Sequence, residues 1–375
     1  MDHVSIDLKK MPRLGFGLMR LPEKDGAIDI PQVCRMADRY LEAGMNYFDT
    51  AYVYHKGLSE RAVREALTAR HPRDSFMVAT KLPGWVLKTK EDRDRVFNEQ
   101  LERCGLDYFD FYLLHSMEDG REVYEELDCF DWGLRLKEEG RIRHFGFSFH
   151  GTPDYLKKIL DAHPEVEFVQ IQLNYADWFN PVVRSGELYQ ILRERDKPIV
   201  VMEPVKGGTL ASLTPELEEM YRAARPDASP ASWALRFVGS LPGVMTILSG
   251  MSAESQMEDN LRTFTRFEPL SEEEKRLVEK VRRIMTDVPL IGCTSCRYCT
   301  PGCSMNIAIP DVFRVLNTMT LYGDSFRPRA FYGDLISQGY GRAQDCIACG
   351  QCEGVCPQHL PIIDLIRSAA EKLDK

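Results

Sequence analysis

The 375-residue sequence lacks the features that mark several broad classes of protein. It contains no apolar run long enough to span a bilayer, and its N-terminus lacks the pattern of a signal peptide. Its net charge is −9, whereas a protein that binds nucleic acid presents a basic face to the phosphates. We therefore expect a cytoplasmic protein that binds neither membranes nor nucleic acid.

Cysteine, by contrast, is abundant near the C-terminus. Eight of the eleven cysteines lie in two runs with the spacing C-x2-C-x2-C-x3-C, and Pro357 follows the second run at once. This is the spacing by which bacterial-type ferredoxins hold 4Fe–4S clusters. Because no secretion signal is visible, such runs indicate metal sites and not disulfides. The expected metal ligands are Cys293, Cys296, Cys299, Cys303, Cys346, Cys349, Cys352 and Cys356.

The two runs are expected to hold two 4Fe–4S clusters in a crossed arrangement. In two-cluster ferredoxins the fourth cysteine of each run binds the other cluster, so Cys356 would complete the cluster of the first run and Cys303 that of the second. The spacer reads as helical near 310–321 and 330–339, and the region resembles the α-helical two-cluster ferredoxins of multi-subunit oxidoreductases. Zinc is the alternative metal, because paired CxxC motifs also bind zinc.

Ahead of the cysteine runs, eight short β-rich segments alternate with segments of helical pattern. The expected strands are 13–18, 45–50, 76–81, 109–115, 144–148, 168–173, 198–203 and 244–250. The expected helices are 30–43, 58–69, 91–104, 122–139, 153–162, 182–195, 229–238 and 252–264. Eight such alternations within about 250 residues fit a closed (β/α)8 barrel. An open doubly wound sheet is the rival, but no GxGxxG follows the first strand.

A charged helical segment, 271–285, lies between the last expected strand and the cysteine runs. No low-complexity stretch separates the two parts, so we expect them to be docked and not loosely tethered. The predicted α/β architecture is a (β/α)8 TIM barrel over residues 1–286. A small, mainly α-helical, ferredoxin-like iron–sulfur domain would follow over residues 287–375.

Polar side chains stand where the expected strands end, which is where such barrels carry their chemistry. Lys81 ends an apolar run and needs a partner if it is buried; Asp49 is the expected partner. A cation beside the phenol of Tyr54 would favour the phenolate and lower its pKa. Tyr54 would then give a proton to a carbonyl oxygen that His115 holds in place.

These residues lie in segments that resemble the signatures of the aldo-keto reductases. The matching segments are 14–20, 45–54, 80–81, 113–115 and 146–148, within a resemblance that covers about residues 12–265. The resemblance implies a barrel that binds NAD(H) or NADP(H) and transfers hydride to an aldehyde or ketone, or from an alcohol in the reverse direction. It assigns catalysis to Asp49, Tyr54, Lys81 and His115. It places along the cofactor Arg20, Ser148, Gln170, Glu203, Ser249, Gly250 and Asn260.

The sequence departs from that family at the expected cofactor site. Met202 stands where an aromatic residue often stacks on the nicotinamide, and Phe149 follows Ser148 where many members have asparagine. The stretch 249–260 contains no lysine or arginine to bind the 2′-phosphate of NADPH, and it carries acidic residues instead. Acidic residues near a ribose suit NAD(H), so we expect no strong preference for NADPH.

Three functions remain open, because a hydride carries two electrons whereas each cluster passes one, and no flavin fingerprint is visible. In the first, the barrel reduces a carbonyl compound and the clusters exchange electrons with a redox protein. In the second, the clusters of a carbonyl reductase are only structural. In the third, the protein is a non-catalytic electron-transfer subunit. The substrate is not identified, although Trp85, Trp178 and Phe179 follow two strands and are candidates to line its pocket.

Overall fold

The computed structural model describes residues 7–119, 122–180, 183–286, 289–322 and 326–374. These residues form two compact units. The barrel unit runs to Pro204 and continues over Ala231–Glu272; the C-terminal unit combines Val205–Pro230 with the chain from Glu273 onward. The predicted domain boundary between residues 286 and 287 falls beside residues 287–288, which lie outside the described residues, and it stays a prediction.

The barrel unit contains eight parallel strands that close on themselves in the order β1-β10-β9-β8-β7-β6-β5-β4. The strands are β1 Leu14–Gly17, β4 Tyr47–Asp49, β5 Met77–Pro83, β6 Phe109–Met117, β7 Ile142–Phe149, β8 Phe168–Gln172, β9 Ile199–Met202 and β10 Val244–Ser249. Each falls within or overlaps one expected segment, so the predicted (β/α)8 barrel is confirmed.

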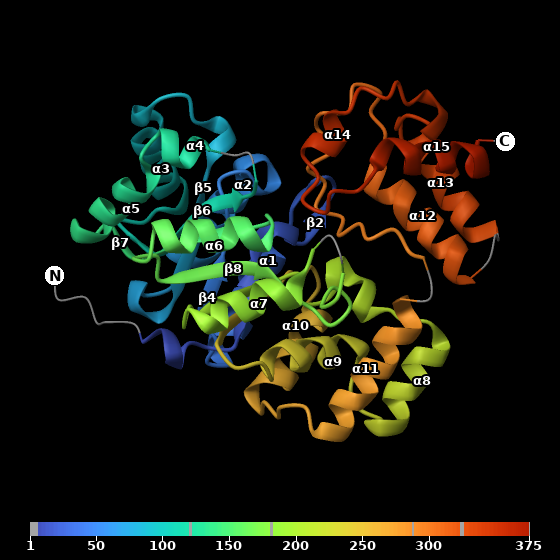
Figure 1. Ribbon diagram of the computed structural model, residues 1–375, viewed down its shortest axis with the longest axis horizontal. Coiled ribbons are helices and arrows are strands. Elements are labelled where there is room, and N and C mark those ends of the chain that lie inside the picture. Colours follow the sequence, from blue (N-terminus) through green and yellow to red (C-terminus); the bar gives the residue numbers. More distant parts are fainter. Residues whose placement is uncertain (1–6, 120–121, 181–182, 287–288, 323–325, 375) are drawn as a thin grey trace. The chain divides into compact units, whose positions relative to one another are not determined.

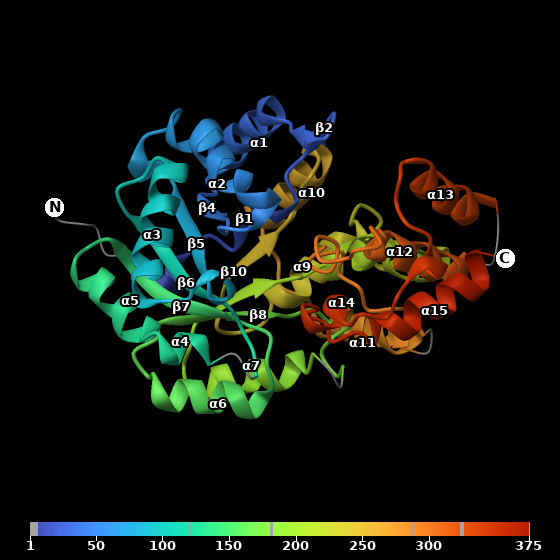
Figure 2. The same cartoon turned by 90° about the horizontal axis from the view of Figure 1, so that it is seen from above.

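Helices surround these strands, as Figures 1 and 2 show for α1, α3, α5, α6 and α7. The helices of the barrel are α1 Ile30–Glu42, α2 Leu58–Val63, α3 Lys90–Cys104, α4 Val123–Glu126, α5 Cys129–Glu138, α6 Pro153–Ala162, α7 Ser185–Glu194, α9 Pro230–Gly239 and α10 Glu254–Thr265. Side-chain caps fix where several begin: Asp29 accepts from the backbone N–H of Gln32, and Thr152 from that of Tyr155.

Some expected helices differ from those observed. The segment expected as one helix over 122–139 is broken at Asp128, whose φ is 49°. Arg93 of α3 donates to the carbonyl oxygens of Leu127 and Asp128, so a tertiary contact satisfies carbonyl groups at the break. The helix expected from residue 182 begins at Ser185, and residues 181–182 lie outside the described residues.

A short antiparallel hairpin was not expected from the sequence. Strands β2, Glu23–Lys24, and β3, Ala27–Ile28, are joined by Asp25 and Gly26. Both turn residues have left-handed φ values, 54° and 79°, which is the backbone that an Asp-Gly hairpin turn requires. The Asp25-Gly26 dipeptide is therefore the sequence signal from which this hairpin could have been predicted.

The C-terminal unit is helical, as predicted. Its helices are α8 Pro215–Ala224, α11 Glu272–Thr286, α12 Ile309–Tyr322, α13 Phe326–Ser337, α14 Gln351–Gly354 and α15 Ile362–Leu373 (Figure 1). Residues from α12 and α15, with the cysteine loops, form its apolar core. Sequence reasoning missed α8, although Thr214-Pro215-Glu216 is a strong helix-start signal. Within the described ranges, no helix is long and apolar enough to cross a bilayer.

Candidate active site at the barrel mouth

The inner face of the barrel changes from apolar to polar toward the ends of the strands. Successive strand residues point to opposite faces, so residues two apart share a face. The lower inner positions form an apolar cluster that includes Tyr47, Ala79, Leu113 and Phe168. The next inner positions along the strands are Asp49, Lys81, His115, Ser148 and Gln170, and all five are buried. The period of the strands thus places these five predicted site residues in one layer.

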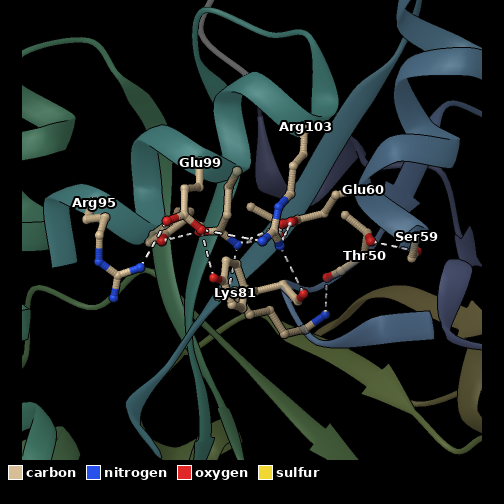
Figure 3. Close-up of polar contacts among 11 residues, drawn as sticks. Thr50, Ser59, Glu60, Lys81, Arg95, Glu99 and Arg103 are labelled. Carbon is tan, nitrogen blue, oxygen red and sulfur yellow. Dashed lines mark hydrogen bonds and ion pairs between the residues drawn. The ribbon is translucent and has the colours of Figure 1, made fainter. Parts of the chain in front are cut away.

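Asp49 and Lys81 form a fully buried ion pair. Lys81 Nζ lies 2.6 Å from Asp49 Oδ1. It donates also to the carbonyl oxygen of Thr50 at 2.8 Å (Figure 3). Burial lowers the pKa of Lys81, and the Asp49 carboxylate opposes this. Burial likewise raises the pKa of Asp49, and Lys81 opposes it. In the described part of the chain, Asp49 Oδ2 has no hydrogen-bond partner.

Tyr54 and His115 complete the set at this layer. Lys81 Nζ lies 5.1 Å from the centre of the Tyr54 ring. The rings of Tyr54 and His115 are 6.0 Å apart and nearly perpendicular. Trp85, which is 46% exposed, lies with its ring 5.1 Å from that of His115. The structure therefore brings Asp49, Tyr54, Lys81 and His115 together and places an exposed aromatic ring beside them.

The chain directly after Tyr54 is a left-handed turn that sequence reasoning did not find. His55, Lys56 and Gly57 have φ values of 49°, 57° and 87°, a conformation that costs a non-glycine residue about 1–2 kcal/mol. His55 holds the turn: its Nε2 accepts from the backbone N–H of Leu21 at 3.1 Å, and its Nδ1 lies 3.1 Å from Glu23. His55 is thus a fixed part of the loop that carries Tyr54.

Two of the predicted cofactor residues lie beside each other on neighbouring strands. Ser148 and Gln170 are paired in register between β7 and β8. Ser148 Oγ accepts from the backbone N–H of Ser116 at 2.7 Å, which leaves the hydroxyl proton available as a donor. Gln170 Nε2 lies 3.6 Å from Met202 Sδ, and Gln170 Oε1 has no hydrogen-bond partner among the described residues. This pair fits a carboxamide such as that of a nicotinamide, which needs a donor and an acceptor.

The remaining predicted cofactor residues form two further groups. Arg20 pairs with Glu203 at 3.1 Å, and the Arg20 side chain covers Gly250, where an added Cβ would lie 3.6 Å from it. Asn260 donates to Ser249 Oγ at 2.8 Å. These contacts hold the turn after β1 and the residue after β9 against the end of β10, and they join the end of β10 to α10.

The departures from the family pattern have structural explanations. Phe149 points away from the inner face and stacks on Tyr155 of α6, with ring centres 6.1 Å apart. The acidic residues of α10 are paired with arginines of α1: Glu254 lies 2.8 Å from Arg35, and Glu258 lies 2.6 Å from Arg39. Their negative charge is therefore partly neutralised, which the sequence did not indicate.

The cysteines of the C-terminal unit gather in the two predicted sets. Burial, with the neighbouring Cys296, Cys293 and Cys356, raises the pKa of the Cys299 thiol to about 12. Those four are the ligands expected for the first cluster. The second set shares one cavity, lined by Cys303, Cys346, Cys349 and Cys352.

Backbone groups and spacing in these sets suit an iron–sulfur cluster. The N–H groups of Ser295 and Ile307 lie 3.4 Å from the sulfurs of Cys293 and Cys303, a contact that tunes cluster potential. Among the residues with described positions, no three cysteine, histidine or acidic side chains converge as the ligands of a single metal ion would. A cubane is larger, since its four thiolates bind different irons.

The comparisons with known proteins agree with this geometry. Residues 13–283 match the model of the aldo/keto reductase family. The chain belongs to the aldo/keto reductase family. Residues 292–360 match the 4Fe-4S dicluster domain, so this aldo/keto reductase carries a ferredoxin-type iron–sulfur domain that follows its barrel in the sequence. Both resemblances expected from the sequence are confirmed.

Several relatives match the barrel of this aldo/keto reductase. It is similar to L-galactose dehydrogenase of Arabidopsis thaliana, with 27% identity over 72% of this chain and 89% of the plant protein. An aldo-keto reductase of Mycobacterium avium is 29% identical over 69% of this chain and 82% of its own. The holo form of a Bacillus halodurans aldo-keto reductase has a TM-score of 0.59 at 27% identity, covering 74% of this chain and 96% of its own. An aldo-keto reductase of Klebsiella pneumoniae in complex with NADPH shares the fold, with a TM-score of 0.59 at 22% identity, covering 72% of this chain and 91% of its own.

A Lys81→Met variant should lower the free energy of unfolding of the barrel unit by about 3–5 kcal/mol, because Asp49 is left as a buried carboxylate without its cation. An Asp49→Asn, Lys81→Met double variant should recover much of that loss, since neither position then carries a buried charge. All four tryptophans, Trp85, Trp132, Trp178 and Trp233, lie in the barrel unit. Urea unfolding followed by tryptophan fluorescence therefore measures this unit. Equal losses in the two variants would contradict the ion pair as the cause.

Proposed function

We propose that this protein uses NAD(P)H to reduce an aldehyde or ketone to the alcohol, or oxidises the alcohol in reverse. The observation that carries the proposal is the buried Lys81 ammonium, 2.6 Å from Asp49 and 5.1 Å from the centre of the Tyr54 ring, with His115 next to that ring. A bound nicotinamide supplies the hydride. The residues at the barrel mouth bind and orient the substrate and protonate its carbonyl oxygen.

Each side chain has a separate role in the proposed reaction. Tyr54 donates its hydroxyl proton to the carbonyl oxygen as the alcohol forms. The Lys81 ammonium stabilises the phenolate that remains, and Asp49 keeps Lys81 protonated at a buried position. His115 orients the carbonyl oxygen, and Trp85 offers an exposed ring to an apolar part of the substrate. Reduction therefore requires protonated Tyr54 and fails at high pH.

Tyr54→Phe should lower NADH-dependent carbonyl turnover by about 10²–10⁴-fold, the usual contribution of a positioned general acid. Tyr52→Phe is the matched control. The hydroxyl of Tyr52 donates to Glu99 at 2.7 Å and its ring packs under Arg103, on the outer side of the loop, so this variant should keep most of its activity. Steady-state kinetics with a panel of aldehydes measures both. Unchanged turnover in Tyr54→Phe would show that Tyr54 is not the general acid, whereas a complete lack of turnover in the wild-type protein would favour a non-catalytic electron-transfer protein.

The cofactor is proposed to bind with Ser148 and Gln170 at the carboxamide and with Arg20, Glu203, Ser249, Gly250 and Asn260 along its remainder. Arg35 and Arg39 stand beside α10, but each is already paired with a carboxylate. A 2′-phosphate would have to displace Glu254 or Glu258 to gain a cationic donor. We therefore keep the expectation that NADPH is not strongly preferred.

The dissociation constants of NADH and NADPH, measured by quenching of tryptophan fluorescence, should differ by less than tenfold. The reason is that the arginine charges near α10 are committed to ion pairs. A dissociation constant for NADPH more than tenfold below that for NADH would show that the phosphate finds a cation, and the expectation would be wrong. As a further test, Glu258→Gln frees Arg39 from its ion pair and should lower the dissociation constant of NADPH but not that of NADH.

We further propose that the C-terminal unit holds two 4Fe–4S clusters, which exchange single electrons with a redox protein. The supporting observation is the grouping of Cys293, Cys296 and Cys299 with Cys356, and of the other four cysteines around one cavity. Cys349 and its neighbour Ile347 are exposed, the latter by 61%, so the second set can be approached from solvent. Such exposure suits exchange with a partner.

The first cysteine run also packs against the chain that leaves strand β9. Gly207, with φ 62°, allows this: a Cβ there would lie 2.6 Å from the carbonyl oxygen of Thr294, which follows Cys293. Both segments belong to the C-terminal unit, and Gly207 comes five residues after Met202, the end of β9. The first cysteine run therefore contacts a segment that continues directly from a barrel strand. This supports the proposal that the clusters serve the reaction of the barrel.

Cys296→Ser and Cys349→Ser should abolish carbonyl reduction driven by an artificial one-electron donor, in which two donor molecules supply the two electrons and the medium supplies the two protons that each carbonyl takes up. They should leave NADH-dependent turnover largely intact, because the hydride comes from the nicotinamide. Both activities are measured anaerobically on protein whose iron content and visible spectrum are known. Retention of both activities would favour clusters that are only structural.

A further inference from the structure

A second buried carboxylate lies directly behind the Asp49–Lys81 pair. Glu60, on α2, has no exposed surface. Its Oε1 accepts from Thr80 Oγ1 and from Gln100 Nε2, each at 2.8 Å, and its Oε2 accepts from Arg103 Nη1 at 3.3 Å (Figure 3). The reaction proposed above does not use Glu60.

The hydrogen bonds of Glu60 favour its ionised form, although burial raises the pKa of its carboxyl. Thr80, Gln100 and Arg103 all present donors to it, whereas a protonated carboxyl would need an acceptor for its own hydrogen. The orientation of Gln100 is fixed independently, because its Nε2 also donates to the Lys81 carbonyl oxygen at 3.0 Å, which can only accept, while its Oε1 accepts from the Tyr112 hydroxyl at 2.6 Å. Its Nε2 must therefore face Glu60. Of the three donors to the buried carboxylate, only Arg103 is charged. In a region of low dielectric, the negative charge of Glu60 therefore acts on neighbouring ionisable groups.

The same network holds the backbone of Lys81. Thr80 is the residue before Lys81 in β5, and Gln100 Nε2 lies 3.0 Å from the Lys81 carbonyl oxygen. Glu60 also raises the pKa of Lys81, in addition to Asp49. Glu60 thus acts on Lys81 in two ways, by fixing the end of its strand and by stabilising its ammonium form.

Arg103 of α3 joins this network to the loop of Tyr54. Its guanidinium lies 4.1 Å from the centre of the Tyr52 ring and 3.4 Å from the Tyr52 carbonyl oxygen. It also closes over Gly57, where an added Cβ would be 3.3 Å from Nη1. Tyr52 and Gly57 bracket Tyr54 in the chain, so one arginine contacts both sides of the loop and the carboxylate behind Lys81.

We propose that Glu60, paired with Arg103, is a positioning residue that sets the protonation of the Lys81–Tyr54 pair. This inference rests on the proposed reductase function. The charged and titratable groups around Lys81 are Asp49, Tyr54 and His115, and those around Glu60 are Arg103, Cys104 and Tyr112. Arg103 is the cation that pairs with Glu60, and the charge of Glu60 also acts on the Lys81 ammonium.

Removing the charge of Glu60 should move the alkaline limb of carbonyl reduction to lower pH. Loss of a nearby negative charge makes both Lys81 and Tyr54 give up their protons more easily, so in Glu60→Gln the limb should fall by about one pH unit. Arg103→Gln removes the opposing cation and should shift the limb to higher pH. Opposite shifts distinguish an electrostatic role from a structural one, which would lower turnover without moving the limb.

Glu99→Gln is the matched control, because Glu99 belongs to the same network and carries the same charge. Its side chain is 35% exposed and pairs with Arg95 and Arg103, so solvent screens it and the limb should stay in place. An unmoved limb in Glu60→Gln, or shifts of one sign in the Glu60 and Arg103 variants, would overturn the proposal.

A second measurement separates this proposal from the reductase function itself. Ultraviolet difference titration follows the Tyr54 phenolate directly, after subtraction of the corresponding Tyr54→Phe background. If the wild-type protein reduces no carbonyl, the proposed function fails, but the phenolate should still form at lower pH in Glu60→Gln. If turnover is normal and the phenolate titration is unchanged, the role of Glu60 fails while the function stands. Tryptophan fluorescence confirms that each variant is folded.

Discussion

The buried ammonium of Lys81 is the constraint on which the barrel mouth depends. A lone ammonium in the barrel interior would give up its proton rather than remain charged. The fold prevents this with Asp49 at 2.6 Å on the neighbouring strand and the Thr50 carbonyl oxygen at 2.8 Å. The apolar layer below excludes water from the pair, which strengthens its electrostatic effect on Tyr54.

The helices outside the barrel complete what the strands begin. The carboxylate of Glu60 and the guanidinium of Arg103 come from α2 and α3, yet they contact β5 and the Tyr54 loop. The strained turn after Tyr54 is held by Leu21 and Glu23, beside the β2–β3 hairpin. Parts of the chain that carry no reacting group thus decide where Tyr54 and Lys81 stand.

The sequence predicted those features that depend on local pattern. The ends of the expected strands placed Asp49, Lys81 and His115 at the barrel mouth, and cysteine spacing gave the sets that the structure gathers. It did not predict features that depend on contacts between distant segments. The helix break at Asp128 needs Arg93 of α3, and the left-handed turn at His55 needs Leu21 and Glu23. From the sequence, Glu60 was only one residue of the expected helix 58–69. Its burial next to β5 becomes visible only once α2 lies against that strand.

The composition of the C-terminal unit has a consequence for how the chain is made. Residues 205–230 are synthesised between β9 and β10, but they pack with residues 273–375, which leave the ribosome later. The barrel must therefore close around a segment whose own partners do not yet exist. During synthesis this segment carries apolar side chains such as Leu217 and Tyr221, both buried in the finished protein, and transiently exposed apolar surface is what chaperones bind.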